Sequence, residues 1–104
     1  MASKSSTYEE GLVSLSTLFR LLSDQTRLRI VLFLTAGERT VTSVCNELKL
    51  PQPTVSHHLS LLRMNGVIVN RRKGKQVIYS LSDNAKTVRK ALQFSIPPFT
   101  VTLA

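Results

Sequence analysis

The first half of the chain carries its apolar residues at helical spacing. From Tyr8 to Leu22 they recur every three or four positions, which predicts an amphipathic helix. A second helix is expected after Ser23 and Asp24, whose side-chain oxygens suit an N-cap, and it ends at Gly37. A third, shorter helix is expected from about Thr42 to Lys49.

A fourth helix is predicted from about Gln52 to Met64. Prolines at 51 and 53 suit the start of a helix, because the first turn does not need their missing amide hydrogens. Val55, Leu59 and Leu62 then form one apolar stripe at spacings of four and three. The opposite face is polar and consists of Gln52, Thr54, Ser56, His57, Ser60 and Arg63.

After Gly66 the apolar period changes from helical to alternating. Residues 67–69 and 77–81 alternate at period two and predict two strands, joined by the basic turn 71–76. A last helix is expected from about Asn84 to Phe94, with 96–104 as a C-terminal tail. Residues 1–7 are expected to be a disordered lead-in, so that 8–95 form one mainly α domain with a small β-hairpin.

Positive charge is concentrated in one stretch of the chain. The formal net charge is +8, and residues 63–90 hold eight basic residues against one acidic residue. Such a surface attracts phosphate polyanions or acidic membranes, although charge alone fits a merely solvated face equally well. Charge therefore narrows the partner without naming it.

The order of the elements makes duplex DNA the favoured partner. A major groove admits one helix, which must bury a stripe and present polar side chains to base edges. The fourth helix has both features, and the basic hairpin can lie along adjacent phosphates. The candidate DNA-binding residues are Gln52, Thr54, Ser56, His57, Ser60, Arg63, Arg71, Arg72, Lys73 and Lys75.

Three motifs resemble the ArsR/SmtB family of bacterial repressors over about residues 15–92. They are Leu-Ser-Asp-Gln-Thr-Arg-Leu-Arg-Ile at 22–30, Pro-Gln-Pro-Thr-Val-Ser-His-His-Leu-Ser-Leu-Leu-Arg at 51–63, and the hairpin segments 66–68 and 72–81. The resemblance implies a winged helix-turn-helix homodimer, paired mainly through its first and last helices. It also implies a repressor that binds inverted-repeat operators and releases them when an inducer binds. Within the second motif, Gln52, Thr54, Ser56 and His57 match the positions that face the groove, whereas His58 and Leu59 match structural positions.

The metal sites of that family have no counterpart in this sequence. Its thiolate site usually shows Cys-x-Cys, but residues 40–45 contain only Cys45. Its other site uses Asp and His on the last helix, and residues 84–95 contain no His although Asp83 is present. Zinc needs about four ligands, so we expect no metal and no cofactor. The sequence does not identify the inducer.

Cys45 has two interpretations. It fits a small buried apolar residue of the third helix, which is the more common situation for a free cysteine. It also fits a redox-sensitive thiol, although the chain has no second cysteine to resolve it.

Other classes of protein fit the sequence less well. An enzyme would need a nucleophile, a base and an acid in one pocket, and no such set is visible, so none is expected. An RNA- or protein-binding module would explain the charge, but only Tyr79 offers an aromatic ring in the basic hairpin. A non-sequence-specific or architectural nucleic-acid-binding protein remains the alternative. Without a signal peptide or membrane span, the expected location is cytoplasmic and away from membranes.

Overall fold

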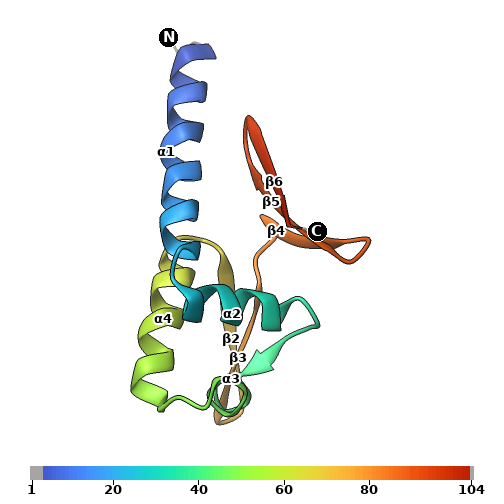
Figure 1. Cartoon of the computed structure of the whole chain (residues 1–104). Helices are drawn as coiled ribbons and strands as arrows, with labels where there is room; N and C mark the ends of the chain where they lie inside the picture. The colour runs from blue at the N-terminus through green and yellow to red at the C-terminus, as the bar shows by residue number, and fades with distance from the viewer. Residues whose placement is uncertain (1–3, 104) are drawn as a thin grey trace.

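In residues 4–103, which the computed structural model describes, a helical half is followed by two small antiparallel sheets (Figure 1). The helices are α1 (Lys4–Leu22), α2 (Gln25–Leu34), α3 (Val41–Leu48) and α4 (Gln52–Met64). The first sheet has the strand order β1-β3-β2, from β1 (Arg39–Thr40), β2 (Ile68–Lys73) and β3 (Gln76–Leu81). The second has the order β4-β5-β6, from β4 (Ala85–Val88), β5 (Ala91–Ile96) and β6 (Phe99–Leu103).

The four predicted helices are confirmed, with ends within a few residues of those expected. Asp24 caps α2 by accepting a hydrogen bond from the Arg27 amide at 3.0 Å. The predicted stripe of α4 is fully buried, since Val55, Leu59 and Leu62 are each 0% exposed. It packs in one core with apolar residues of α2 and α3, among them Ile30 and Val44.

The predicted basic hairpin is confirmed as β2 and β3. The pairing runs from Ile68 opposite Leu81 to Lys73 opposite Gln76, which leaves Gly74 and Lys75 as a two-residue turn. Gly74 has a φ of 62°, the left-handed conformation that such tight turns favour. Strand β1, which pairs with β3 as a short third strand, was not predicted from the sequence. Helices α3 and α4 with this hairpin form a winged helix-turn-helix, as expected.

The predicted last helix is wrong, because residues 85–96 form β4 and β5 instead. Arg89 and Lys90 have φ values of 50° and 69°, a left-handed pair that ends one strand and turns into the next. From Leu92 onward the apolar residues also fit a period of two, and Leu92 and Phe94 are buried. The expected dimer interface between the first and last helices therefore needs correction, because residues 4–103 contain no helix after α4.

The expected ends of the domain also need correction. Residues 4–7 belong to α1 rather than to a disordered lead-in, while residues 1–3 lie outside the described part. The expected tail contains β6, which pairs with β5 from Ile96 opposite Phe99 to Leu92 opposite Leu103. Apolar and β-branched residues in 99–103 explain why this segment extends the sheet.

The second sheet rests against α1 at a glycine. A Cβ atom at Gly11 would lie 2.6 Å from both the Pro97 carbonyl oxygen and the Pro98 Cδ. One turn earlier, the Tyr8 ring packs on Phe99 with ring centroids 5.7 Å apart. Glycine therefore allows the β5–β6 turn to approach the helix backbone closely.

We expect Gly11→Leu to separate the β5–β6 turn from α1. Overpacking of this kind costs about 1–3 kcal/mol of unfolding free energy, more than the roughly 1 kcal/mol that leaving glycine gains in a helix. Urea unfolding should show the loss, and amide exchange should show faster exchange in β5 and β6. Ser16→Leu, at an exposed position of the same helix, is the control. Equal stability of the two variants would argue against the close contact.

Candidate nucleic-acid interface

The outer face of α4 carries the predicted polar residues. Gln52, Thr54, His57, Ser60 and Arg63 are exposed, and Ser56 is half-buried. Because the buried stripe occupies the opposite side, these side chains cannot turn inward without exposing the core. A partner that approaches α4 would meet amide, hydroxyl and imidazole groups, with a guanidinium in the last turn.

The wing presents four basic side chains, all exposed: Arg71, Arg72, Lys73 and Lys75. Neighbouring residues of a strand point to opposite faces, so Arg71 lies in one row with Ile78 and Arg72 in the other with Val77. The basic residues thus surround the hairpin on both faces instead of forming one flat patch. Such a hairpin can offer cations to a strand of phosphates from either side.

One of these cations already has a partner. The Arg71 Nη2 donates to the Glu38 Oε1 at 2.7 Å, and both side chains are about half exposed. Glu38 precedes β1, so the ion pair ties the wing to the loop after α2. An exposed pair contributes little to stability, about 0–1 kcal/mol, but it lowers the net charge that Arg71 presents. This pairing could not be predicted from the sequence, because 33 positions separate the two residues.

A cluster around Arg27 ties the helical half to α4. Its Nε donates to the Leu21 carbonyl at 2.8 Å, and its Nη1 lies 3.4 Å from the His58 Nδ1. The Asp24 Oδ2 is 4.0 Å from the same Nη1. His58 is therefore half-buried against α2, which agrees with the structural position implied for it, whereas its neighbour His57 faces solvent. The contact between Arg27 and His58 could not be predicted from the sequence, because 31 positions separate the two residues.

Within residues 4–103 there is no group of three or more His, Cys, Asp or Glu that could hold an ion. Cys45 is a half-buried free cysteine that packs against the hydrophobic core. The helices of the described part are all too short or too polar to cross a membrane.

The chain matches a protein-family model and several known proteins. Residues 24–69, from the cap of α2 to the start of β2, match the family model described as bacterial regulatory protein, arsR family. The transcriptional repressor SdpR of Bacillus subtilis is 34% identical over 68 residues, which cover 65% of this chain and 76% of SdpR. The chain belongs to the ArsR family. The matched region of the family model contains the helix-turn-helix but neither α1 nor the second sheet.

Two further proteins resemble the chain, one in sequence and one in structure. The arsenical resistance operon repressor of Escherichia coli is 48% identical over 66 residues, which cover 62% of this chain and 56% of that protein. A homodimeric winged helix-turn-helix DNA-binding domain from Mycobacterium bovis superposes with a TM-score of 0.69 at 27% identity, covering 78% of this chain and 75% of that one.

The match to several of these relatives covers only part of their length. The chain spans only about half the length of several of the curated ArsR-family relatives that it matches, the E. coli protein among them. The relatives are named as repressors and regulators of transcription and not as enzymes.

The carboxylate of Asp24, which caps α2, makes the stability of the fold depend on pH. The hydrogen bond from the Arg27 amide, with the Arg27 charge nearby, keeps the pKa of Asp24 below its ordinary value despite some desolvation. A lowered pKa means that the carboxylate stabilises the fold above its unfolded pKa, and that this contribution is lost as the pH falls through the folded pKa.

We expect Asp24→Ala to lose about 0.5–2 kcal/mol of unfolding free energy at pH 7. The difference from the unmodified chain should shrink in acid, below the pKa of Asp24. Asp24→Asn keeps a capping oxygen without the charge and is the matched control. Its loss at neutral pH should be smaller, and it should shrink in acid in the same way, because only the unmodified chain titrates at this position. Thermal or urea unfolding across pH measures both, and a loss that is the same at acid and neutral pH would exclude the titrating cap.

Proposed function

We propose that the chain is a transcriptional repressor that binds inverted-repeat operators in duplex DNA as a homodimer. In this proposal α4 enters the major groove and the wing lies on the flanking backbone. Base contacts come from Gln52, Thr54, Ser56 and His57, and backbone contacts from Ser60, Arg63 and the four basic wing residues. The proposed site of action is the cytoplasm.

One observation carries the proposal: a polar face of α4, fixed outward by a fully buried stripe, stands next to an exposed basic hairpin. Short amides and hydroxyls suit base edges, since Gln can pair with adenine and Ser or Thr can contact bases or phosphates. Membership in the ArsR family supports the same conclusion, because the matched relatives are named as repressors.

The homodimer is supported by an apolar stripe on α1. Tyr8, Leu12 and Phe19 are 49%, 38% and 53% exposed, at spacings of four and seven along one side of the helix. Apolar rows of this kind mark contact surfaces, and a two-fold dimer would bring two copies of α4 to successive major grooves. The structural neighbour from M. bovis is itself homodimeric.

Selection of binding sites from random duplex DNA at near-physiological salt tests the function directly. We expect an enriched inverted repeat with half-sites about one helical turn apart, because a two-fold dimer reads symmetric sites. In the same selection, Gln52→Ala should relax one position of each half-site, by roughly 1–3 kcal/mol of discrimination. Gln93→Ala, on the second sheet, is the control and should recover the unchanged motif. Recovery of no motif, with tight binding only at low salt, would leave a non-specific or architectural DNA-binding protein.

The wing is tested by the dependence of DNA affinity on salt. Replacing Arg71 and Arg72 together by Ala should weaken binding to every sequence and reduce the slope of log K against log salt by about 1–2, near 0.9 for each lost phosphate contact. The smaller value applies if Glu38 already neutralises Arg71. Arg89→Ala with Lys90→Ala removes the same charge from the β4–β5 turn and should change the slope less. Identical slopes for the two double variants would remove the wing from the interface.

A further inference from the structure

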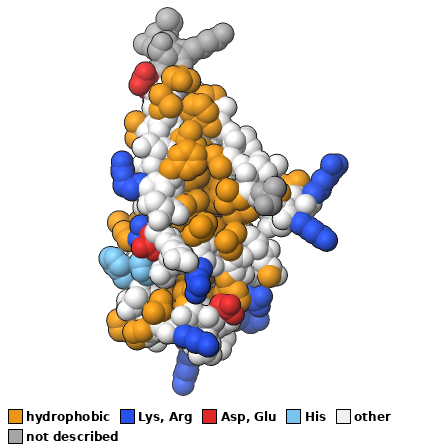
Figure 2. All heavy atoms as spheres, viewed as in Figure 1, with side chains coloured by type: hydrophobic (Ala, Val, Ile, Leu, Met, Phe, Trp, Pro, Cys, Tyr) orange, Lys and Arg blue, Asp and Glu red, His pale blue; other side chains and the backbone are white. Residues whose placement is uncertain are grey.

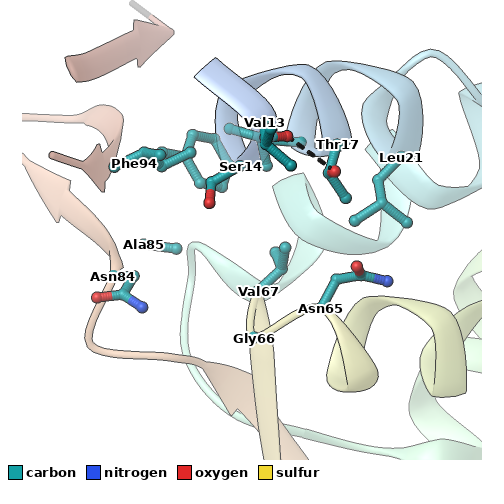
Figure 3. Close-up of a pocket in the computed structure, with 12 residues that line it drawn as sticks. Val13, Ser14, Thr17, Leu21, Asn65, Gly66, Val67, Asn84, Ala85 and Phe94 are labelled. Carbon is teal, nitrogen blue, oxygen red and sulfur yellow. Dashed lines mark hydrogen bonds between the residues drawn. The ribbon is translucent and has the colours of Figure 1, made fainter. Parts of the chain in front are cut away.

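A pocket of about 240 Å³ opens between α1, the end of α4 and the second sheet. Figure 3 shows its walls: Ser14 and Thr17 extend from α1, Val67, just before β2, points toward that helix, and Phe94 and Ala85 close the side of the second sheet. In the space-filling view the apolar surface runs as a band along this side of the molecule, between α1 and the second sheet (Figure 2). None of the residues that line the pocket is among the proposed DNA contacts.

The lining favours a neutral and mainly apolar ligand. Its apolar part includes Leu18, Val67 and Phe94, and its polar part consists of hydroxyls and amides. Of the twelve residues that line it, all within the described part of the chain, none is charged and none is Cys or His. An ion would therefore be desolvated there without a partner, at high cost, whereas an aromatic ring would bury apolar surface.

Two of the polar groups keep hydrogen-bonding capacity for a ligand. The Thr17 hydroxyl donates to the Val13 carbonyl at 2.9 Å, which leaves its oxygen free to accept. The Asn65 amide nitrogen donates to the Leu61 carbonyl at 2.8 Å, which leaves its second hydrogen and its oxygen available. A ligand with one hydroxyl or N–H group would find partners at the rim of an otherwise apolar cavity.

The size sets the class of molecule. Cavities of about 150 Å³ hold a benzene ring, and drug-sized ligands need roughly 300–1,000 Å³. A pocket of 240 Å³ lies between these limits. It suits one or two fused rings with a single polar substituent.

A second copy on the apolar stripe of α1 would leave this pocket open. With about 100° per residue, Thr17 lies roughly 140° around the helix from Leu12 and 160° from Phe19. The pocket and the stripe that includes Tyr8 therefore occupy different sides of α1. The occupant that fits the pocket is a small molecule.

We propose that this pocket binds a neutral mono- or bicyclic aromatic molecule and that its occupancy regulates DNA binding. The second part of this proposal, the regulation of DNA binding, rests on the proposed function. Asn65 and Gly66 follow α4 directly, and Val67 leads into the wing, so a ligand touches the junction between the two DNA-contacting elements. The junction is held by the Val67 amide, which donates to the Leu62 carbonyl at 3.0 Å, and by the Ser82 hydroxyl, which donates to the Gly66 carbonyl at 2.6 Å.

Regulation follows if the ligand prefers one arrangement of α4 relative to α1. Helix α1 carries the proposed dimer surface, so a ring wedged between α1 and this junction alters the spacing of the two α4 helices in the dimer. A ligand that binds the DNA-free arrangement more tightly must weaken operator binding by the same factor, typically about 5- to 150-fold.

The binding test uses the full chain and three neutral probes: 1-naphthol, indole and p-cresol. Because the chain contains no Trp, the emission of 1-naphthol can be followed without protein background. We expect saturable binding below about 1 mM, with amide shifts in NMR spectra centred on Thr17, Asn65, Val67 and Ala85. Absence of binding by all three probes at that concentration would overturn the site.

Variants decide whether the probes occupy this pocket. Thr17→Phe fills it from α1 and should abolish binding, while Ser16→Phe, one position away and outside the lining, should retain it. Ser14→Phe fills the pocket from an exposed position and serves if Thr17→Phe unfolds. Equal binding by filled and control variants would move the site elsewhere and overturn the proposal. So would dissociation of the homodimer by Thr17→Phe without any probe binding, because a second copy would then occupy the pocket.

The regulation is tested by measuring, by fluorescence anisotropy, how the probe changes the affinity of the chain for the selected operator. Probe should weaken operator binding of the unmodified chain and of Ser16→Phe but not of the filled variants. Pocket binding without any change in operator affinity would overturn the regulation and keep the site. Failure to select any operator would instead remove the proposed function, while probe binding would still be judged by the NMR shifts and the filled variants.

Discussion

The burial of one side of α4 is the constraint on which the rest of the structure depends. Val55, Leu59 and Leu62 are completely enclosed by the helical core, and each such side chain contributes about 1.5–3 kcal/mol through burial. Exposed polar contacts such as the Arg71–Glu38 pair contribute far less, about 0–1 kcal/mol. The apolar stripe therefore sets the rotation of α4 about its axis, and with it the identity of every residue that faces outward. The Arg27 cluster refines that position by joining the end of α1, the cap of α2 and His58.

The elements with strong local patterns could be predicted from the sequence. The spacing of Leu59 and Leu62 identified α4 and its outward face, and alternation around Val77 and Tyr79 identified the wing. The second sheet could not be predicted in the same way. Val88, Ala91 and Leu92 fit a helical spacing as well as a strand, and what decides between them is contact with α1, which lies far away in sequence. The ion pair of Arg71, the contact of Arg27 with His58 and the pocket could not be predicted for the same reason, because each joins segments that only the folded chain brings together.

The ArsR-family match covers only the middle of the chain. The matched residues 24–69 include α2, α3 and α4, whose packing depends mainly on contacts between neighbouring elements. The second sheet lies beyond this match and meets α1, which lies before it. The chain thus combines the helix-turn-helix that the family model matches with α1 and the second sheet, which lie outside that match, and the pocket lies where the two parts meet.

The contact between Tyr8 and Phe99 has a consequence for the order in which the chain folds. It joins rings that are 91 positions apart, close to the greatest separation that the described residues allow. Contacts among the helices span shorter loops, so they can form early, while closure of so long a loop carries a larger entropic cost and comes late. During synthesis the helix-turn-helix can therefore assemble while the ribosome is still producing β5 and β6. Until those strands arrive, the side of α1 around Gly11 stays uncovered, and a nascent chain held at that stage exposes apolar surface to its neighbours.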